Sequence, residues 1–180
     1  MSHLRDLRKS LAVGALVLAS SGVASARDLE TVDSVDLDRY LGTWYEIASY
    51  PAWFQKNCTS VTAQYRLRDD GLISVINRCR KGTLDGKEKK AKGRAKVVDT
   101  QTNAKLKVSF FGPFWGDYWI IDLDEDYQWV VVGEPKRKYL WILSRNPTMD
   151  QKLFDEIVAR LPSSGYDAGR LQMTLQRAGD

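Results

Sequence analysis

The sequence has almost no histidine: His3 is the only one among 180 residues. If residues 1–26 are removed on export, as argued below, none remains. A chain without histidine cannot form a Ser/His/Asp or Cys/His catalytic arrangement or a histidine-rich zinc or iron site. We therefore expect no metal site, no cofactor and no enzymatic activity.

Long hydrophobic runs are also lacking. The longest, residues 11–19, is shorter than the roughly 20 residues needed to cross a bilayer as a helix. It follows Arg5, Arg8 and Lys9 and precedes Ala-Ser-Ala at 24–26, the three parts of a secretory signal peptide. This pattern predicts cleavage after residue 26, a single domain over 27–180, and export. A lipoprotein anchor needs a cysteine directly after the cleavage site, and neither Cys58 nor Cys79 is near it, so we expect no lipoprotein anchor.

A large excess of basic residues is lacking too. The signal peptide carries three basic residues and one acidic residue, so its removal lowers the formal net charge from +4 to +2. Nucleic-acid binding usually needs a larger, concentrated basic surface. We expect no nucleic-acid partner.

Short segments with strand character follow one another along the chain. They are separated by turn residues such as Asp69, Asp70 and Gly71. Eight such segments cover residues 42–49, 59–68, 72–80, 91–98, 104–111, 117–123, 127–133 and 139–145. Short connections and the lack of a long crossover favour an up-and-down barrel over a sandwich.

Helical spacing appears only after these segments. Thr148 and Gln151 form a potential capping box, and apolar residues at helical spacing continue to Leu161, next to Pro162. A strand-like segment over 171–176 follows. The prediction is an all-β fold: an eight-stranded up-and-down antiparallel β-barrel with one C-terminal α-helix.

Three segments resemble the conserved blocks of the lipocalin family. Residues 42–48 read Gly-Thr-Trp-Tyr-Glu-Ile-Ala, 124–127 read Asp-Glu-Asp-Tyr, and 141–145 read Trp-Ile-Leu-Ser-Arg. With residues 74–78 and 107–114, they make the chain similar to the bacterial outer-membrane lipocalins and their apolipoprotein D relatives. The similarity extends over about residues 37–177.

The blocks predict which end of the barrel is closed. In a meander the first strand starts, and the eighth ends, at the same end. Trp44, two residues after Gly42, should therefore meet Arg145 in a cation–π contact. These three residues are expected to be structural.

The resemblance also implies a ligand pocket. The positions that line it in the family correspond here to Tyr65, Asn77, Phe110, Tyr118 and Trp141. Aromatic rings with one amide suit an apolar chain that carries a polar head. Ordinary barrel-core packing is the alternative for each of them.

The loops at the opposite end combine aromatic and basic residues. They contain Trp53, Phe54, Trp115, Lys136, Arg137 and Lys138. This combination suits contact with an anionic membrane surface. The alternative is that the aromatic side chains fold inward and plug the mouth.

Two cysteines in an exported chain favour one disulfide, Cys58–Cys79, over two free thiols. If Tyr65 and Asn77 both face inward, simple alternation puts Cys79 inside and Cys58 outside. The bridge therefore needs a bulge or a loop conformation near Cys58.

The resemblance implies a location in the periplasm, in association with the outer membrane. The leading functional hypothesis is therefore a periplasmic binding protein that stores or carries fatty acids, lysophospholipids or similar hydrophobic ligands for membrane maintenance. We expect it to be a monomer or a homodimer. A haem or tetrapyrrole carrier is an alternative; without histidine its axial ligand would be Tyr or Met. An enzyme acting on an amphipathic substrate is the third hypothesis.

Overall fold

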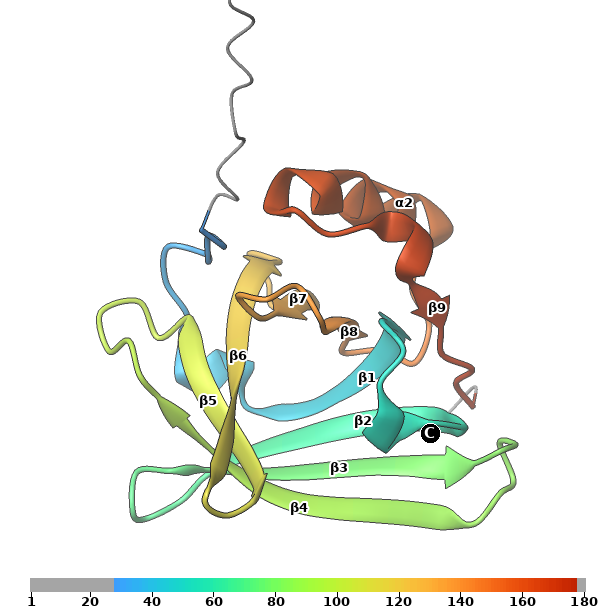
Figure 1. Ribbon diagram of the computed structural model, residues 1–180, viewed down its shortest axis with the longest axis horizontal. Helices are drawn as coiled ribbons and strands as arrows, with labels where there is room; N and C mark the ends of the chain where they lie inside the picture. Colours follow the sequence, from blue (N-terminus) through green and yellow to red (C-terminus); the bar gives the residue numbers. More distant parts are fainter. Residues whose placement is uncertain (1–27, 178–180) are drawn as a thin grey trace, which may run out of the picture.

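The computed structural model describes residues 28–177, and the predicted signal peptide lies outside this range. Eight antiparallel strands make up the barrel: β1 (Gly42–Ser49), β2 (Cys58–Leu67), β3 (Ile73–Lys81), β4 (Glu88–Val97), β5 (Lys105–Phe111), β6 (Phe114–Leu123), β7 (Trp129–Gly133) and β8 (Leu140–Ser144). Each pairs with its neighbour in sequence, and β1 pairs with both β8 and β2 (Figure 1). The sheet is therefore a closed up-and-down barrel, as predicted.

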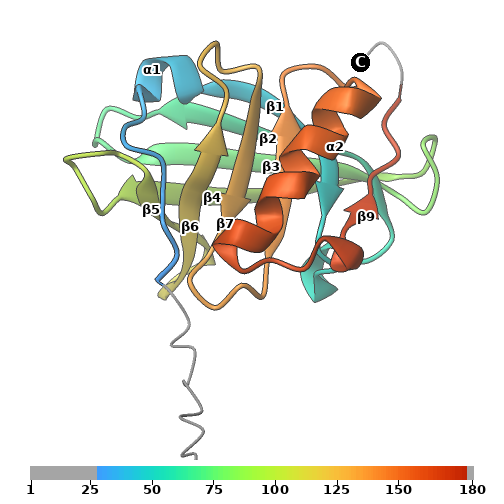
Figure 2. The ribbon, with the colours of Figure 1, turned by 90° about the horizontal axis from the view of Figure 1, so that it is seen from above.

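Short helices flank the barrel. They are α1 (Leu37–Tyr40), α2 (Gln151–Arg160) and the 3₁₀ helices η1 (Trp53–Gln55), η2 (Leu161–Ser164) and η3 (Ala168–Arg170). The longest, α2, lies outside the barrel wall (Figures 1 and 2). The helices within residues 28–177 lack the length and apolar character needed to cross a membrane.

The C-terminal helix was predicted, but its boundaries differ. Its N-cap is Asp150, whose carboxylate accepts a hydrogen bond from the Leu153 N–H at 3.1 Å, so the proposed capping box at Thr148 is wrong. An Asp is as good an N-cap as a Thr and here lies directly before the first helical residue. The helix ends at Arg160, and Pro162 lies in η2, where its fixed φ is compatible with the tighter turn.

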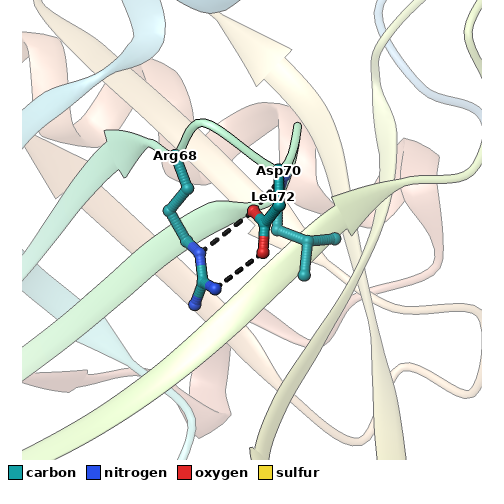
Figure 3. A network of polar contacts seen from close by, with 3 residues as sticks. All are labelled: Arg68, Asp70 and Leu72. Atoms are coloured by element: carbon teal, nitrogen blue, oxygen red, sulfur yellow. Dashed lines mark hydrogen bonds and ion pairs between the residues drawn. The ribbon is translucent and has the colours of Figure 1, made fainter.

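The predicted turn between β2 and β3 is present at the closed end. Arg68 Nε and Nη2 donate to the Asp70 carboxylate at 3.1 and 2.6 Å, and the Leu72 N–H donates to Asp70 Oδ1 at 3.1 Å (Figure 3). The Arg68 hydrogen bonds are the main reason why the pKa of Asp70 lies below its usual value. Gly71 supplies the positive φ of 77° that the turn requires.

The hydrophobic core has two parts. One fills the barrel and includes Trp44, Val75 and Leu106. The other lies between the outer wall and α2 and includes Ile142 and Ile157. This division leaves the barrel interior as a separate compartment.

The seam between β1 and β2 is only half closed by their own pairing, which covers residues 42–45 of β1. Beyond it, β9 (Gln172–Met173) pairs with Ala48 and Ser49 (Figure 1). The Thr174 N–H donates to the Ile47 carbonyl at 2.9 Å, and the Ser60 N–H of β2 donates to the Leu175 carbonyl at 2.7 Å. Most of the predicted strand over 171–176 is thus an extended bridge across the seam.

Candidate functional site

The closed end of the barrel is built around Trp44, which is fully buried. The guanidinium carbon of Arg145 lies 3.7 Å from the centre of the Trp44 ring. Arg145 Nη1 donates to the Thr43 carbonyl at 2.9 Å, and Nη2 donates to the Arg39 carbonyl at 2.6 Å. Gly42 has a φ of 101°, and a Cβ there would lie 3.3 Å from Arg145 Nη1. The structure therefore brings Gly42, Trp44 and Arg145 together at one end.

Directly inside this end, three tyrosines form what we call the tyrosine triad: Tyr40, Tyr65 and Tyr118. The hydroxyl of Tyr118 lies 2.6 Å from that of Tyr40 and 3.0 Å from that of Tyr65. Burial raises the pKa of Tyr65 to about 12 and raises the pKa values of the other two well above their ordinary value. The triad is therefore neutral at physiological pH.

A small cavity lies against the triad. Its wall consists of the three tyrosines with Ile73, Ala95, Leu106 and Val108. Its volume is about 10 Å³, the space of about one water molecule. The interior of this conformation is thus filled mainly by side chains.

Asn77 and Phe110 lie above the triad, toward the mouth. Both belong to inner-face positions, Asn77 opposite Ala63 of β2 and Phe110 packed against the barrel core. The Phe110 ring covers Gly93 of β4, where a Cβ would approach it to 2.8 Å. Asn77 Oδ1 is buried and has no hydrogen-bond partner.

A row of aromatic side chains leads from the inner wall to the surface; we call it the aromatic row. Trp141 of β8 packs against the barrel core, and its ring stacks on Tyr139 with centroids 5.8 Å apart. Phe54 lies 5.5 Å from Tyr139, and Trp53 lies 5.6 Å from Phe54. Trp53 is 78% exposed. The predicted pocket residue Trp141 and rim residues Trp53 and Phe54 therefore form one continuous feature through Tyr139.

The rim between β5 and β6 differs from the sequence prediction. Trp115 was expected in a loop, but β6 begins at Phe114, so Trp115 lies in a strand. Its ring is flanked by Arg94 and Lys96, at 5.3 and 4.7 Å from the centroid. The exposed side chains at this hairpin are instead Phe111 and Phe114. Their exposure could not be read from the run Phe-Phe-Gly-Pro-Phe-Trp, because the β5–β6 register shifts between Val108 and Phe111.

The basic turn between β7 and β8 is organised by Glu134. Its carboxylate accepts hydrogen bonds from the backbone N–H groups of Lys136 and Lys138. Arg137 is directed away, with Nε donating to the Ser164 carbonyl at 3.2 Å. Of the three basic residues, only Lys136 and Lys138 are exposed.

Cys58 and Cys79 form a disulfide, as predicted, with Cα atoms 5.4 Å apart. The register of β2 against β3 shifts between Thr59 and Thr62, and Ser60 has a positive φ of 46°. This bulge changes the side of the sheet to which Cys58 points, so that it meets Cys79. The expected irregularity near Cys58 is therefore present.

Sequence reasoning missed the buried carboxylate of Glu46. Its Oε1 accepts hydrogen bonds from Ser49 Oγ, Gln55 Nε2 and Thr174 Oγ1, at 2.9, 2.7 and 2.6 Å. Burial raises the pKa of Glu46, while these donors oppose the shift. The sequence did contain one indication of this burial: Glu46 lies two residues after the inward-facing Trp44, so strand alternation places both side chains on the inner face. Glu46 links β1 to η1 at the mouth and to the C-terminal bridge.

Comparison with known proteins places these features in context. The family model of the lipocalin-like domain matches residues 35–176. The chain is 43% identical to Outer membrane lipoprotein Blc of Escherichia coli (strain K12), over 86% of this chain and 87% of that protein. It is 35% identical to Apolipoprotein D of Mus musculus, over 80% and 78%. The solved structure of insecticyanin from the tobacco hornworm Manduca sexta superposes with a TM-score of 0.66 at 20% identity, over 83% of this chain and 85% of that chain, which supports the fold alone.

Proposed function

Because the chain belongs to the lipocalin family, we propose that it is an exported carrier that holds a fatty acid, a lysophospholipid or a similar lipid inside its barrel without covalent chemistry. The observation that carries the proposal is the interior, closed at one end by Arg145 over Trp44 and lined mainly by apolar side chains. Each buried methylene of a ligand contributes about 0.8 kcal/mol. A long acyl chain can therefore bind tightly even after the cost of ordering it.

The aromatic row supports a route for the ligand. Trp141 and Tyr139 are partly buried, whereas Trp53 is exposed, so apolar contact continues from the surface to the interior. In the conformation described above, the barrel interior is filled mainly by side chains. If these rings moved outward, they would leave space inside the barrel for an acyl chain. We propose that the acyl chain slides along this row.

Contact with a membrane would bring the mouth to the ligand's source. Exposed Trp53, Phe111 and Phe114 suit the headgroup region, where aromatic rings are favoured. Lys136 and Lys138 add positive charge, each contributing about 1 kcal/mol near an anionic surface. The relatives named as outer membrane lipoproteins support a location in the periplasm near the outer membrane.

The first experiment separates pocket from rim with two variants. Trp141→Ala should weaken binding of a soluble fluorescent fatty-acid analogue by about 1 to 3 kcal/mol, because it removes inner apolar surface. Trp53→Ala should leave that affinity nearly unchanged but reduce co-sedimentation with vesicles. If Trp141→Ala binds the analogue as tightly as the parent protein does, the ligand is not in the barrel.

The second experiment tests the basic turn. Lys136→Gln with Lys138→Gln should slow lipid uptake from anionic vesicles and reduce its salt dependence, because exposed charges act within about 8 to 10 Å. Arg137 is retained because its contact with Ser164 supports the turn. The matched control, Arg66→Gln with Lys152→Gln, removes the same charge from exposed positions away from the mouth. If both pairs of substitutions slow lipid uptake equally, the effect comes from net charge alone, and the basic turn has no specific role in membrane contact.

A further inference from the structure

The outer wall of the barrel carries a row of cations on β4, which we call the cation row: Lys90, Lys92, Arg94 and Lys96. Ala95, between the last two, is buried in the barrel core, so strand alternation places the four residues of the row outside. All four are exposed. Helix α2 lies on the opposite side of the barrel and leaves this face uncovered (Figures 1 and 2).

The positive charge of the protein is concentrated on this wall. Strand β4 has five basic residues and one acidic residue, Glu88, whereas the formal net charge of the whole chain is only +4. Alternate residues of a strand lie about 6.8 Å apart, so the row extends over roughly 20 Å. Lys107 of β5 lies opposite Lys96 but pairs with Asp117 at 3.3 Å. Among the described residues, no carboxylate forms an ion pair with the cation row itself, which therefore presents uncompensated charge to solvent.

Trp115 orders two of these cations. Its ring centroid lies 5.3 Å from the Arg94 guanidinium carbon and 4.7 Å from Lys96 Nζ. Between this ring of β6 and the cations of β4 lies Ser109 of β5, which pairs with Arg94 and is buried. Side chains that are already held at the surface lose less conformational freedom when they bind a partner. The ring thus prepares this part of the row for binding.

Two exposed aromatic rings adjoin the row. Phe111 and Phe114 pair across the β5–β6 hairpin and are 76% and 77% exposed. Phe111 follows Ser109 by two residues, so strand alternation directs it to the outer face as well. Arg94 reaches this hairpin, because a Cβ at Gly112 would lie 3.7 Å from Arg94 Nη2. Positive charge and exposed apolar surface are therefore continuous on this wall.

This combination fits one kind of partner. A soluble polyanion would neutralise the cations but leave the two rings in water. A bilayer with anionic phospholipids satisfies both, because its phosphates attract the cations and aromatic rings are favoured among the headgroups.

We infer that the wall formed by the cation row, Trp115 and the β5–β6 hairpin is a docking surface for an anionic phospholipid bilayer. This inference rests on the membrane contact in the proposed function, but it requires no lipid in the barrel. The hairpin with Phe111 and Phe114 also belongs to the rim of the mouth. Docking on this wall therefore keeps the mouth beside the bilayer.

The first test reverses one charge of the row. Lys92→Glu should weaken co-sedimentation with vesicles of phosphatidylcholine and phosphatidylglycerol in equal amounts by about 25-fold, because each unit of charge near an anionic surface contributes about fivefold. Lys152→Glu is the matched control, since it makes the same change at an exposed position of α2, on the opposite side of the barrel. Salt screens a charge at that distance, so the control should weaken binding by less than about twofold. Equal vesicle binding by the two variants would overturn the inference.

The second test separates a bilayer from a soluble polyanion. Phe111→Ser together with Phe114→Ser should weaken binding to the same vesicles by about tenfold, because it removes apolar surface that enters the headgroup region. Retention of this double variant on a heparin column should be unchanged, since its cations remain. If the double variant binds the vesicles as the parent does, while Lys92→Glu loses vesicles and heparin alike, the partner is a soluble polyanion and the inference is wrong.

Binding of the soluble fatty-acid analogue keeps this inference distinct from the proposed function. Each of these changes lies on the outer wall or the rim, so every variant should bind the analogue as tightly as the parent protein does. A variant set that binds the analogue but shows no specific loss on vesicles would overturn the docking surface alone. Failure of the parent protein to bind the analogue would instead overturn the proposed function.

Discussion

Trp44→Ala should be one of the most destabilising single changes in this protein. A buried tryptophan removes roughly 150 to 250 Å² from water, worth about 4 to 6 kcal/mol at 25 cal/mol per Å². The contact with Arg145 adds about 0.5 to 2 kcal/mol. The Tyr40 carbonyl would lose the indole N–H but keep Arg145 Nη2 at 3.2 Å, so no acceptor is left alone. Because neighbours relax, we expect a net loss of about 3 to 5 kcal/mol.

Trp53→Ala is the matched control, because it deletes the same side chain from a site that is 78% exposed. We expect a loss below about 1 kcal/mol. Urea unfolding followed by far-ultraviolet circular dichroism measures both variants without relying on tryptophan fluorescence. Equal destabilisation by the two changes would refute the assignment of closed end and mouth.

Three other changes test separate features. The disulfide Cys58–Cys79 closes a loop of 21 residues. Its reduction should destabilise the protein by about 3 kcal/mol in the chain-entropy estimate and lower the melting temperature by several degrees. An unchanged melting temperature would contradict this prediction. The raised pKa of Glu46 means that the folded protein holds this proton more tightly than the unfolded chain does. The unfolding free energy should therefore fall as pH rises from about 4.5 toward that raised pKa, and urea titrations at several pH values should find this fall missing in Glu46→Gln. Asn77→Leu should raise the melting temperature of the ligand-free protein by a few degrees in calorimetry, because it removes an unpartnered polar group; a lower melting temperature would argue against it.

The barrel could be predicted from the sequence because its signals are local. Alternation such as that of Leu106 and Val108, and turn residues such as Gly71, set strand and turn independently of the rest of the chain. In a meander the first strand starts, and the eighth strand ends, at the same end of the barrel, and this placed Trp44 next to Arg145. Neither step required knowledge of side-chain packing.

Features that depend on competition between neighbouring positions were harder to predict. Asp150 and Thr148 are both good N-caps, and the sequence alone does not distinguish them; in the structure Asp150 directly precedes the first helical residue and accepts the hydrogen bond from Leu153. Trp115 was placed in a loop because the predicted strands ended at residue 111 and resumed at residue 117, whereas β6 begins at Phe114. The tyrosine triad was missed as a unit because it joins a residue of α1 to residues of β2 and β6, and no spacing in the sequence connects them.

The bridge across the β1–β2 seam has a consequence for the order in which this protein can form. Residues 172–176 fill the upper half of the seam, yet they come after all eight barrel strands in the sequence. A chain emerging from a ribosome or a translocation channel presents β1 first and the bridge last. Until that final segment arrives, the hydrogen bonds from Thr174 to Ile47 and from Ser60 to Leu175 cannot form, and the wall stays open along this line. The wall along this seam is therefore completed only after residues 172–176 are available, near the end of chain synthesis.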